Sequence, residues 1–213
     1  LRLGAVETPL ALAGIALLTI GLSFKVAIVP FHMWTPDVYS GAPTPVTGFM
    51  SAAAKAAGFA IMIRILLVGI PLEQVEGWET ILGWLAILTM TIGNLVALQQ
   101  QNVKRMLAYS SIAHIGYMLL GFCAANQRGY SSAMFYILNY VFMSVAAFGL
   151  LTAISRRGVE VTDIKDLAGM SERNPWLAFM MLLVLFSLAG VPPLVGFIAK
   201  IGVLEALIQA HLV

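Results

Sequence analysis

Four side chains that can carry a proton interrupt long apolar stretches of this sequence, namely Lys25, Lys55, His114 and Lys200. A charged side chain at the centre of a bilayer costs roughly 2.5 to 3.5 kcal/mol, so it needs a partner, a water-filled cavity or a function. Burial disfavours the charged forms of lysine and histidine, which lets a buried group load and release protons near neutral pH. The four residues therefore predict a proton relay spread over several helices.

A purely structural role is the alternative for each of these groups. Lys55 lies about 15 Å into its apolar stretch at the rise of a helix, too far from either end to reach the lipid headgroups easily. Lys25 and Lys200 lie nearer a helix end or break, so snorkelling or a static ion pair would equally explain them. A lone histidine such as His114 is often a hydrogen-bonded core residue, but two serines one turn away would give it a hydrated route.

Two proline-containing breaks lie close to two of the lysines. Pro30 follows Lys25 by five residues, and Pro193, the second of two adjacent prolines, precedes Lys200 by seven. Proline lacks a backbone donor and disfavours helix just before it, so each helix is expected to break there. Such kinks often serve packing alone, but broken helices in transporters mark ion sites. Because the two breaks lie on helices of opposite direction, they suggest an inverted repeat.

Further positions around these groups are candidates for a supporting role. A histidine and an aspartate follow the first break, two serines precede His114, and a glutamate follows Lys200 by five residues. That glutamate would either tune Lys200 or act near the outer surface. The supporting positions are Pro30, His32, Asp37, Ser110, Ser111, Pro192, Pro193 and Glu205.

The composition indicates the class of protein that must position these groups. Of 213 residues, 60% are hydrophobic and only 10% are charged, whereas about 25% are charged in soluble domains. About 20 apolar residues span a bilayer as a helix, and runs of that length are too long for barrel strands. The sequence therefore predicts an all-α, polytopic transmembrane helical bundle in a single domain over residues 1–213.

We expect six helical units, over residues 9–29, 45–68, 81–98, 104–123, 132–154 and from 175 to the end, where residues 191–193 interrupt the run. A loop punctuated by prolines and glycine is expected between the first two. The single cysteine has no CxxC or nearby thiol, so no metal, iron–sulfur or disulfide site is predicted. Without an initiator methionine or a signal-peptide pattern at its start, the sequence is expected to be an internal fragment of a longer chain.

Positive charges predict the orientation, because short cytoplasmic loops of membrane proteins are enriched in lysine and arginine. Placing loops 30–44, 99–105 and 155–174 in the cytoplasm leaves only Arg128 in the opposite loops. A net charge of +2 with scattered basic residues argues against nucleic-acid binding. The basic residues assigned to the cytoplasmic side are Lys104, Arg105, Arg156, Arg157, Lys165 and Arg173.

Three motifs carry a resemblance to a known family: FKVAIVPFHMWTPDVYSGAPTPVT, NVKRMLAYSSIAHIGYMLLG and LFSLAGVPPLVGFIAK. In this order they resemble the antiporter-like membrane subunits of respiratory complex I, the NADH-quinone oxidoreductase. The WTPDVYSGAP run separates one branch of that family from the others and from multisubunit sodium/proton antiporters, which tend to have a WLPxAH-type sequence there. The resemblance implies a multi-pass protein of the bacterial inner membrane.

The resemblance also implies roles for individual residues. Lys25 corresponds to the lysine on the first broken helix, Lys55 to the central lysine of the next helix, and Lys200 to the terminal lysine on the second broken helix. His114 occupies the position that links them. The family's glutamate partner of the first lysine lies on an upstream helix, and no intramembrane acid precedes Lys25 in this sequence.

The function implied by the resemblance is proton translocation in the membrane arm, driven by the oxidation of NADH by quinone. The chain would bind no cofactor, and NADH, FMN, iron–sulfur clusters and quinone would be bound by other subunits. The expected partners are the other membrane-arm subunits and the lipid bilayer. Two alternatives stay open: a stand-alone cation/proton antiporter subunit, and a structural membrane subunit whose charges only hold helices together.

Overall fold

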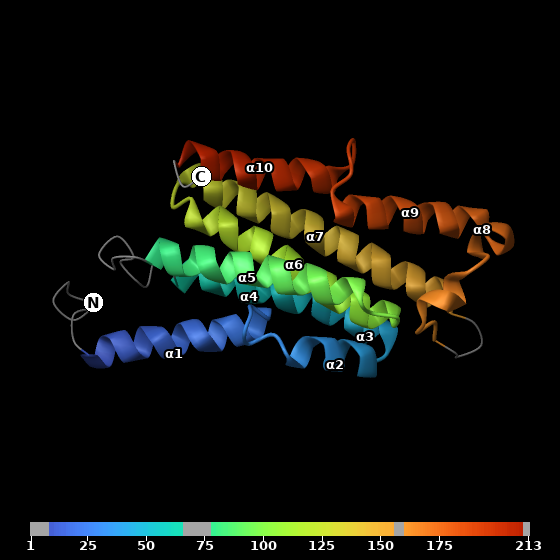
Figure 1. Cartoon of the computed structure of the whole chain (residues 1–213), viewed down its shortest axis with the longest axis horizontal. Helices are drawn as coiled ribbons and strands as arrows, with labels where there is room; N and C mark the ends of the chain where they lie inside the picture. The colour runs from blue at the N-terminus through green and yellow to red at the C-terminus, as the bar shows by residue number, and fades with distance from the viewer. Residues whose placement is uncertain (1–8, 66–77, 156–159, 211–213) are drawn as a thin grey trace.

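The computed structural model describes residues 9–65, 78–155 and 160–210. These residues form helices and connections, and the only strand-like pairing among them is an isolated bridge between Asn102 and Asp163. The predicted all-α fold is therefore confirmed. Figure 1 shows the helices lying side by side along the long axis of the bundle. Within the described residues, four are long and apolar enough to cross a membrane: Thr44–Arg64, Thr80–Leu98, Val103–Cys123 and Gln127–Ile154.

The centre of the bundle is α6 (Val103–Cys123), the most buried of these four spans. The preceding helix, α5 (Trp78–Leu98), packs closely against it, and α7 (Gln127–Ile154) contacts it on another side. Glycine makes the α5–α6 approach possible, because a Cβ on Gly116 would lie 2.8 Å from the carbonyl oxygen of Ala86. Close contact through small residues is typical of helix pairs in membranes.

The first broken helix consists of α1 (Pro9–Val26) and α2 (Trp34–Gly41). Helix α1 ends three residues earlier than expected, because Ala27 adopts a left-handed conformation with φ of 69° and Pro30 cannot donate a backbone hydrogen bond. The indole of Trp34 spans the break by donating to the carbonyl of Phe24 at 2.8 Å.

Residues 34–41 were expected to belong to a loop, and that expectation is wrong, because they form α2. Pro36 did not prevent the helix because it lies in the first turn, where backbone N–H groups have no partner within the helix. Asp37 also lies in that turn, where a negative charge complements the helix dipole.

The second broken helix consists of α9 (Pro175–Ala189) and α10 (Val195–Gln209). The predicted interruption is confirmed, and it begins at Gly190, which adopts φ of 82° before the two prolines. Figure 1 shows α1 and α2 along one long edge of the bundle and α9 and α10 along the opposite edge, running in the opposite direction.

The span that carries Lys55 contains a feature that the sequence did not predict. It is built from α3 (Thr44–Phe49), a π-helical turn η2 (Met50–Ala54) and α4 (Lys55–Arg64). A π-helical turn widens the helix by one residue and is found disproportionately at functional sites. Here it lies directly before Lys55.

The start of α7 also differs from the prediction, since the helix begins at Gln127 instead of residue 132. The side chain of Asn126 caps it by accepting a hydrogen bond from the backbone N–H of Gly129 at 2.7 Å. Arg128, expected in a loop, therefore lies in the first helical turn. A capping asparagine stabilises a helix start by about 1 kcal/mol.

Loops 30–44 and 99–105 meet residues 160–174 of the third loop at one end of the bundle. The last of these contains a 3₁₀ turn η5 (Ile164–Leu167) and a short helix α8 (Met170–Arg173). Its backbone N–H at Ile164 donates to the carbonyl of Gln101, and Arg105 forms an ion pair of 3.0 Å with Asp37. The three loops thus share one face of the protein.

Lys104 is the buried centre of this face. Its ammonium donates to Glu160 at 2.7 Å and to the carbonyl of Ala42 at 2.8 Å, and Glu160 also accepts from the backbone N–H of Thr44. The hydrogen bonds from Lys104 and Thr44 lower the pKa of the Glu160 carboxyl below its usual value. One ion pair therefore links α6, the α2–α3 turn and the 155–174 loop.

We expect Glu160→Gln to destabilise this end by about 1 to 3 kcal/mol, because it leaves the buried ammonium of Lys104 without its countercharge. Since folding depresses the pKa of Glu160, the stabilisation is complete above about pH 4.3 and is lost as the pH falls through the folded-state pKa. Thermal unfolding of the wild type and the variant between pH 7 and pH 3.5 measures the difference. Asp37→Asn, which removes a solvent-exposed pair, is the matched control.

Candidate functional site

Lys55 is buried in the middle of the bundle, with only 3% of its surface exposed. Its ammonium donates a 2.5 Å hydrogen bond to the hydroxyl of Ser111 on α6 and lies 5.4 Å from the centroid of the Tyr39 ring. Within the described residues, no carboxylate pairs with it. The polar partner of this buried ammonium is thus a hydroxyl, and the other close group is an aromatic ring, so neither supplies a full countercharge.

A cluster of three hydroxyls lies beside Lys55, which we call the hydroxyl cluster: Ser51 on η2, and Tyr140 and Ser144 on α7. The Ser51 and Tyr140 hydroxyl oxygens are 2.7 Å apart, and Ser144 donates to Ser51 at 2.7 Å. All three side chains are buried. The cluster joins the π-helical turn to α7.

His114 is buried on α6, one turn beyond Ser111. Its Nδ1 lies 2.7 Å from the hydroxyl of Tyr136, and its ring packs against that of Tyr140 with centroids 5.3 Å apart. Because the hydroxyl of Tyr136 can donate or accept, this contact suits either tautomer of the imidazole. His114 thus lies among tyrosines between the two broken helices.

Lys200 lies beside the second break, as its position in the sequence predicted. Its ammonium donates to the carbonyl of Ala189 at 2.8 Å, a group that the end of α9 leaves free, and lies 4.8 Å from the centroid of the Tyr117 ring. Gly190 allows this approach, because a Cβ there would lie 2.8 Å from Cδ of Lys200.

A cavity of about 570 Å³ lies between α5, α6, α9 and α10, and both His114 and Lys200 line it. It extends toward the loop face, where Gln100 and Ile164 line it. Its volume far exceeds that of a single water. Its polar lining consists of Asn94, Gln100, Ser110, His114, Tyr117 and Lys200.

Lys25 differs from the other candidates, because it lies exposed on the outside of the bundle. Its stem packs beside Gly58 of α4, where a Cβ would lie 3.5 Å from Cγ of Lys25. Within the described residues, nothing forms an ion pair with its ammonium. The face of α1 that carries Lys25 is therefore open in this chain.

The supporting candidates divide into two groups. Ser110 and Ser111 lie at the site, whereas the prolines lie exposed in the two breaks and His32 lies in the turn between α1 and α2. Asp37 is paired with Arg105 on the loop face instead. Glu205 lies 3.8 Å from Arg128 and accepts from Gln209, so its contacts are with these residues and not with Lys200.

Sequence reasoning named Ser110 and Ser111 but missed the tyrosines near the lysines and the serines Ser51 and Ser144. One signal was available on α7, where Tyr136, Tyr140 and Ser144 recur at intervals of four and so share one face of a helix. Ser51 stands four residues before Lys55. A stripe of hydroxyls inside an apolar span is costly unless it is hydrogen-bonded, so it indicates a polar interior.

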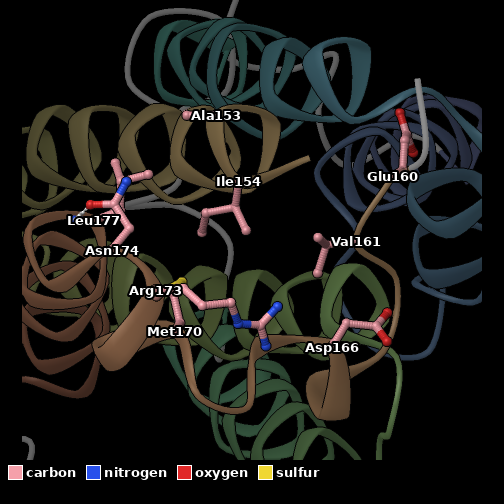
Figure 2. A pocket seen from close by; sticks show the side chains of 9 residues that line it. All are labelled: Ala153, Ile154, Glu160, Val161, Asp166, Met170, Arg173, Asn174 and Leu177. Carbon is pink, nitrogen blue, oxygen red and sulfur yellow. Dashed lines mark hydrogen bonds between the residues drawn. The ribbon is translucent and has the colours of Figure 1, made fainter. Parts of the chain in front are cut away.

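A second pocket, of about 330 Å³, lies on the loop face and is drawn in Figure 2. Figure 2 shows the side chain of Arg173 extending from α8 toward Asp166. The guanidinium donates to the backbone carbonyl of Ala168, and the Asp166 carboxylate accepts from the N–H of Asp163. Both polar groups thus form hydrogen bonds with nearby backbone atoms. None of the four candidate proton carriers lines this pocket.

Two helices broken beside lysines, with a buried lysine and histidine on the helices between them, are typical of membrane transporters that move ions. The family described as "NADH:quinone oxidoreductase/Mrp antiporter, TM" matches residues 3–213, and the chain belongs to this family.

Known members support the assignment. NADH-quinone oxidoreductase subunit N of Coxiella burnetii is 58% identical over 94% of this chain, and that of Nitrosomonas europaea is 50% identical over 97%. These matches cover 41% and 43% of the two relatives, so the chain spans about two fifths of their length.

Solved structures agree with this assignment. A chain of respiratory complex I from Thermus thermophilus superposes with a TM-score of 0.80 at 41% identity, covering 96% of this chain and 44% of that one. A chain of the Mrp complex from a Dietzia species gives a TM-score of 0.88 at 27% identity, covering 98% and 39%.

Proposed function

We propose that this chain is the part of a subunit N-type membrane subunit of NADH-quinone oxidoreductase that moves protons across the membrane. The observation that carries the proposal is the buried Lys55, which donates to a serine instead of a carboxylate. A group so placed can alternate between ammonium and amine as nearby charges change. Residues 1–213 form one transmembrane domain in this proposal.

The proton route begins at the first broken helix and ends at the second. Lys25 and Lys55 exchange a proton, which passes by His114 to Lys200 and then leaves. The cavity that holds His114 and Lys200 supports the second half of this route, because it offers a polar lining between the two groups. The exposed Lys25 supports the first half, because its open face suits a helix that carries an acid.

Partners and location follow from the same proposal. Other membrane-arm subunits and the lipid bilayer surround the chain in the bacterial inner membrane, and loops 30–44, 99–105 and 155–174 face the cytoplasm. Among the described residues, no group of His, Cys, Asp or Glu side chains is placed to hold a metal ion. Other subunits bind NADH, FMN, iron–sulfur clusters and quinone, so the driving energy arrives from outside this chain.

Cation/proton exchange is the second candidate, favoured by the likeness to a chain of an Mrp complex. It predicts sodium-dependent proton exchange in proteoliposomes without NADH. The proposed function predicts proton movement only with NADH and quinone, whether or not sodium is present. A purely structural subunit would predict that the buried ionisable groups are dispensable for both activities.

Lys200→Ala in the assembled complex is expected to lower NADH-driven proton translocation on the order of 10-fold, because it removes the last carrier of the route. Acidification measured by a pH-sensitive dye in inside-out vesicles tests this. Lys165→Ala, an exposed lysine of the loop face, is the matched control and keeps the wild-type rate. Equal rates for the two variants would contradict the proposal.

A further inference from the structure

The candidate carriers do not contact one another directly. The ammonium of Lys55 donates to Ser111, Nδ1 of His114 meets Tyr136, and the ammonium of Lys200 donates to a backbone carbonyl. Within the described residues, no hydrogen bond joins any two of these three groups. A proton that leaves Lys55 therefore needs other groups to reach the large cavity.

In the hydroxyl cluster, one hydroxyl proton is not used in hydrogen bonds between the three members, and we call it the spare proton. Its three hydroxyls contain three protons but form two hydrogen bonds with one another, and the proton of Ser144 is used on Ser51. If Ser51 donates to Tyr140, the spare proton is on Tyr140, and in the reverse case it is on Ser51. Whichever direction holds, the spare proton is on Ser51 or Tyr140.

A cavity of about 10 Å³ lies beside Ser51 and Tyr140, the two residues that can hold the unused hydroxyl proton. It is lined by five residues that carry a hydroxyl, together with apolar residues: Ser51, Ser110, Ser111, Tyr140 and Ser144. A volume of about 10 to 15 Å³ with two to four polar partners is what one ordered water requires. Ser111, which accepts from Lys55, thus shares a water-sized polar space with Tyr140.

Ser110 connects this small cavity to the large one. It lines both the 10 Å³ cavity and the 570 Å³ cavity that holds His114 and Lys200, and it is only partly buried. Leu107 and Leu188 also line both cavities, so the wall between them is thin and mainly apolar. Ser110 provides the polar group in that wall.

We propose that Tyr140 and Ser51 bind one water beside Ser111, and that this water and the hydroxyl of Ser110 carry protons from Lys55 to the cavity of Lys200. The inference deepens the proposed function and rests on it. It assigns the positioning of this water to Tyr140, a residue that neither the lysine positions nor the proline breaks predicted.

The transfer is balanced in protons. Lys55 changes from ammonium to amine. The hydroxyl of Ser111, the water and the hydroxyl of Ser110 each accept one proton and release another, so they end neutral. The proton arrives at the imidazole of His114 or the amine of Lys200, which becomes charged. Ser111 now donates to the carbonyl of Ala108 at 2.6 Å, so its hydroxyl must rotate for each transfer.

A structural lock is the competing explanation of the cluster, since it ties η2 to α7. The two explanations differ in how they rank the members of the cluster. As a lock, Tyr140 and Ser144 are equivalent, because each contributes one hydrogen bond to Ser51. As a proton link, Tyr140 matters more, because Ser51 and Tyr140 still have a spare proton after Ser144 is removed.

The test compares Tyr140→Phe, Ser144→Ala and the control Thr152→Val in the assembled complex. Thr152 lies on the same helix, and its hydroxyl donates only to the carbonyl of Phe148 at 2.9 Å. NADH-driven proton translocation in vesicles is measured in H₂O and D₂O. We expect Tyr140→Phe to lose on the order of 10-fold in rate with a larger solvent isotope effect, Ser144→Ala to lose much less, and Thr152→Val to match the wild type.

Two results would overturn the inference. One is a wild-type rate for Tyr140→Phe, and the other is an equal loss for Tyr140→Phe and Ser144→Ala with an unchanged isotope effect, as a lock requires. If Lys55→Ala slows translocation while Tyr140→Phe does not, the inference fails and the proposed function stands. If Lys55→Ala has no effect, the proposed function itself fails.

Discussion

Gly196→Ala is expected to prevent the second broken helix from forming correctly. A Cβ on Gly196 would lie 1.8 Å from the carbonyl oxygen of Ser187 and 2.7 Å from its carbonyl carbon. Both atoms belong to the backbone of α9, so no side-chain rotation can relieve the clash. Overpacking of this kind costs about 3 kcal/mol or more, and it would displace Lys200 from the break.

The amount of assembled complex in membranes, measured by native electrophoresis, should therefore fall severely for this variant. Gly202→Ala is the matched control on the same helix, because its Cβ would lie 3.6 Å from the hydroxyl oxygen of Ser132, an ordinary contact. Assembly of both variants at the wild-type level would show that α9 and α10 do not pack as described.

Lys55→Ala is expected to have the largest effect on activity. It removes the buried lysine that donates to Ser111, so translocation should fall on the order of 100-fold if every proton of the route passes through it. Lys55→Arg separates charge from proton transfer, because a guanidinium stays protonated in proteins. We expect Lys55→Arg to be as inactive as Lys55→Ala, measured as acidification of vesicles.

Assembly must be measured alongside, since either change leaves a buried cavity or a bulkier group beside Ser111. An arginine variant that retains wild-type translocation would contradict a proton-carrying role and would favour a role for the charge alone.

The broken helices could be predicted because their causes are local. Pro30, Pro192 and Pro193 lack a backbone donor wherever they occur, and Lys55 is far from either end of its span by counting residues alone. The lengths of α6 and α9 follow from their apolar runs in the same way. The breaks and the span of α6 were confirmed in this way, whereas the loop expected over residues 34–41 was not.

The parts that sequence could not predict depend on contacts between distant residues. The π-helical turn before Lys55 has the sequence MSAAA, which contains no proline or glycine to mark it. Ser51 meets Tyr140 and Ser144 only because α3 and α4 pack against α7, about ninety positions along the chain. The ion pair of Asp37 with Arg105 also joins residues far apart in the sequence.

The ratio of protons translocated to electrons transferred in Lys55→Ala tests the central claim most directly. It is measured on the residual NADH:quinone turnover of the purified complex in proteoliposomes, with wild-type assembly established first. If Lys55 carries protons, the ratio falls below that of the wild type, because electron transfer continues without this route. A wild-type ratio in the fully assembled variant would contradict the account and leave Lys55 a structural residue.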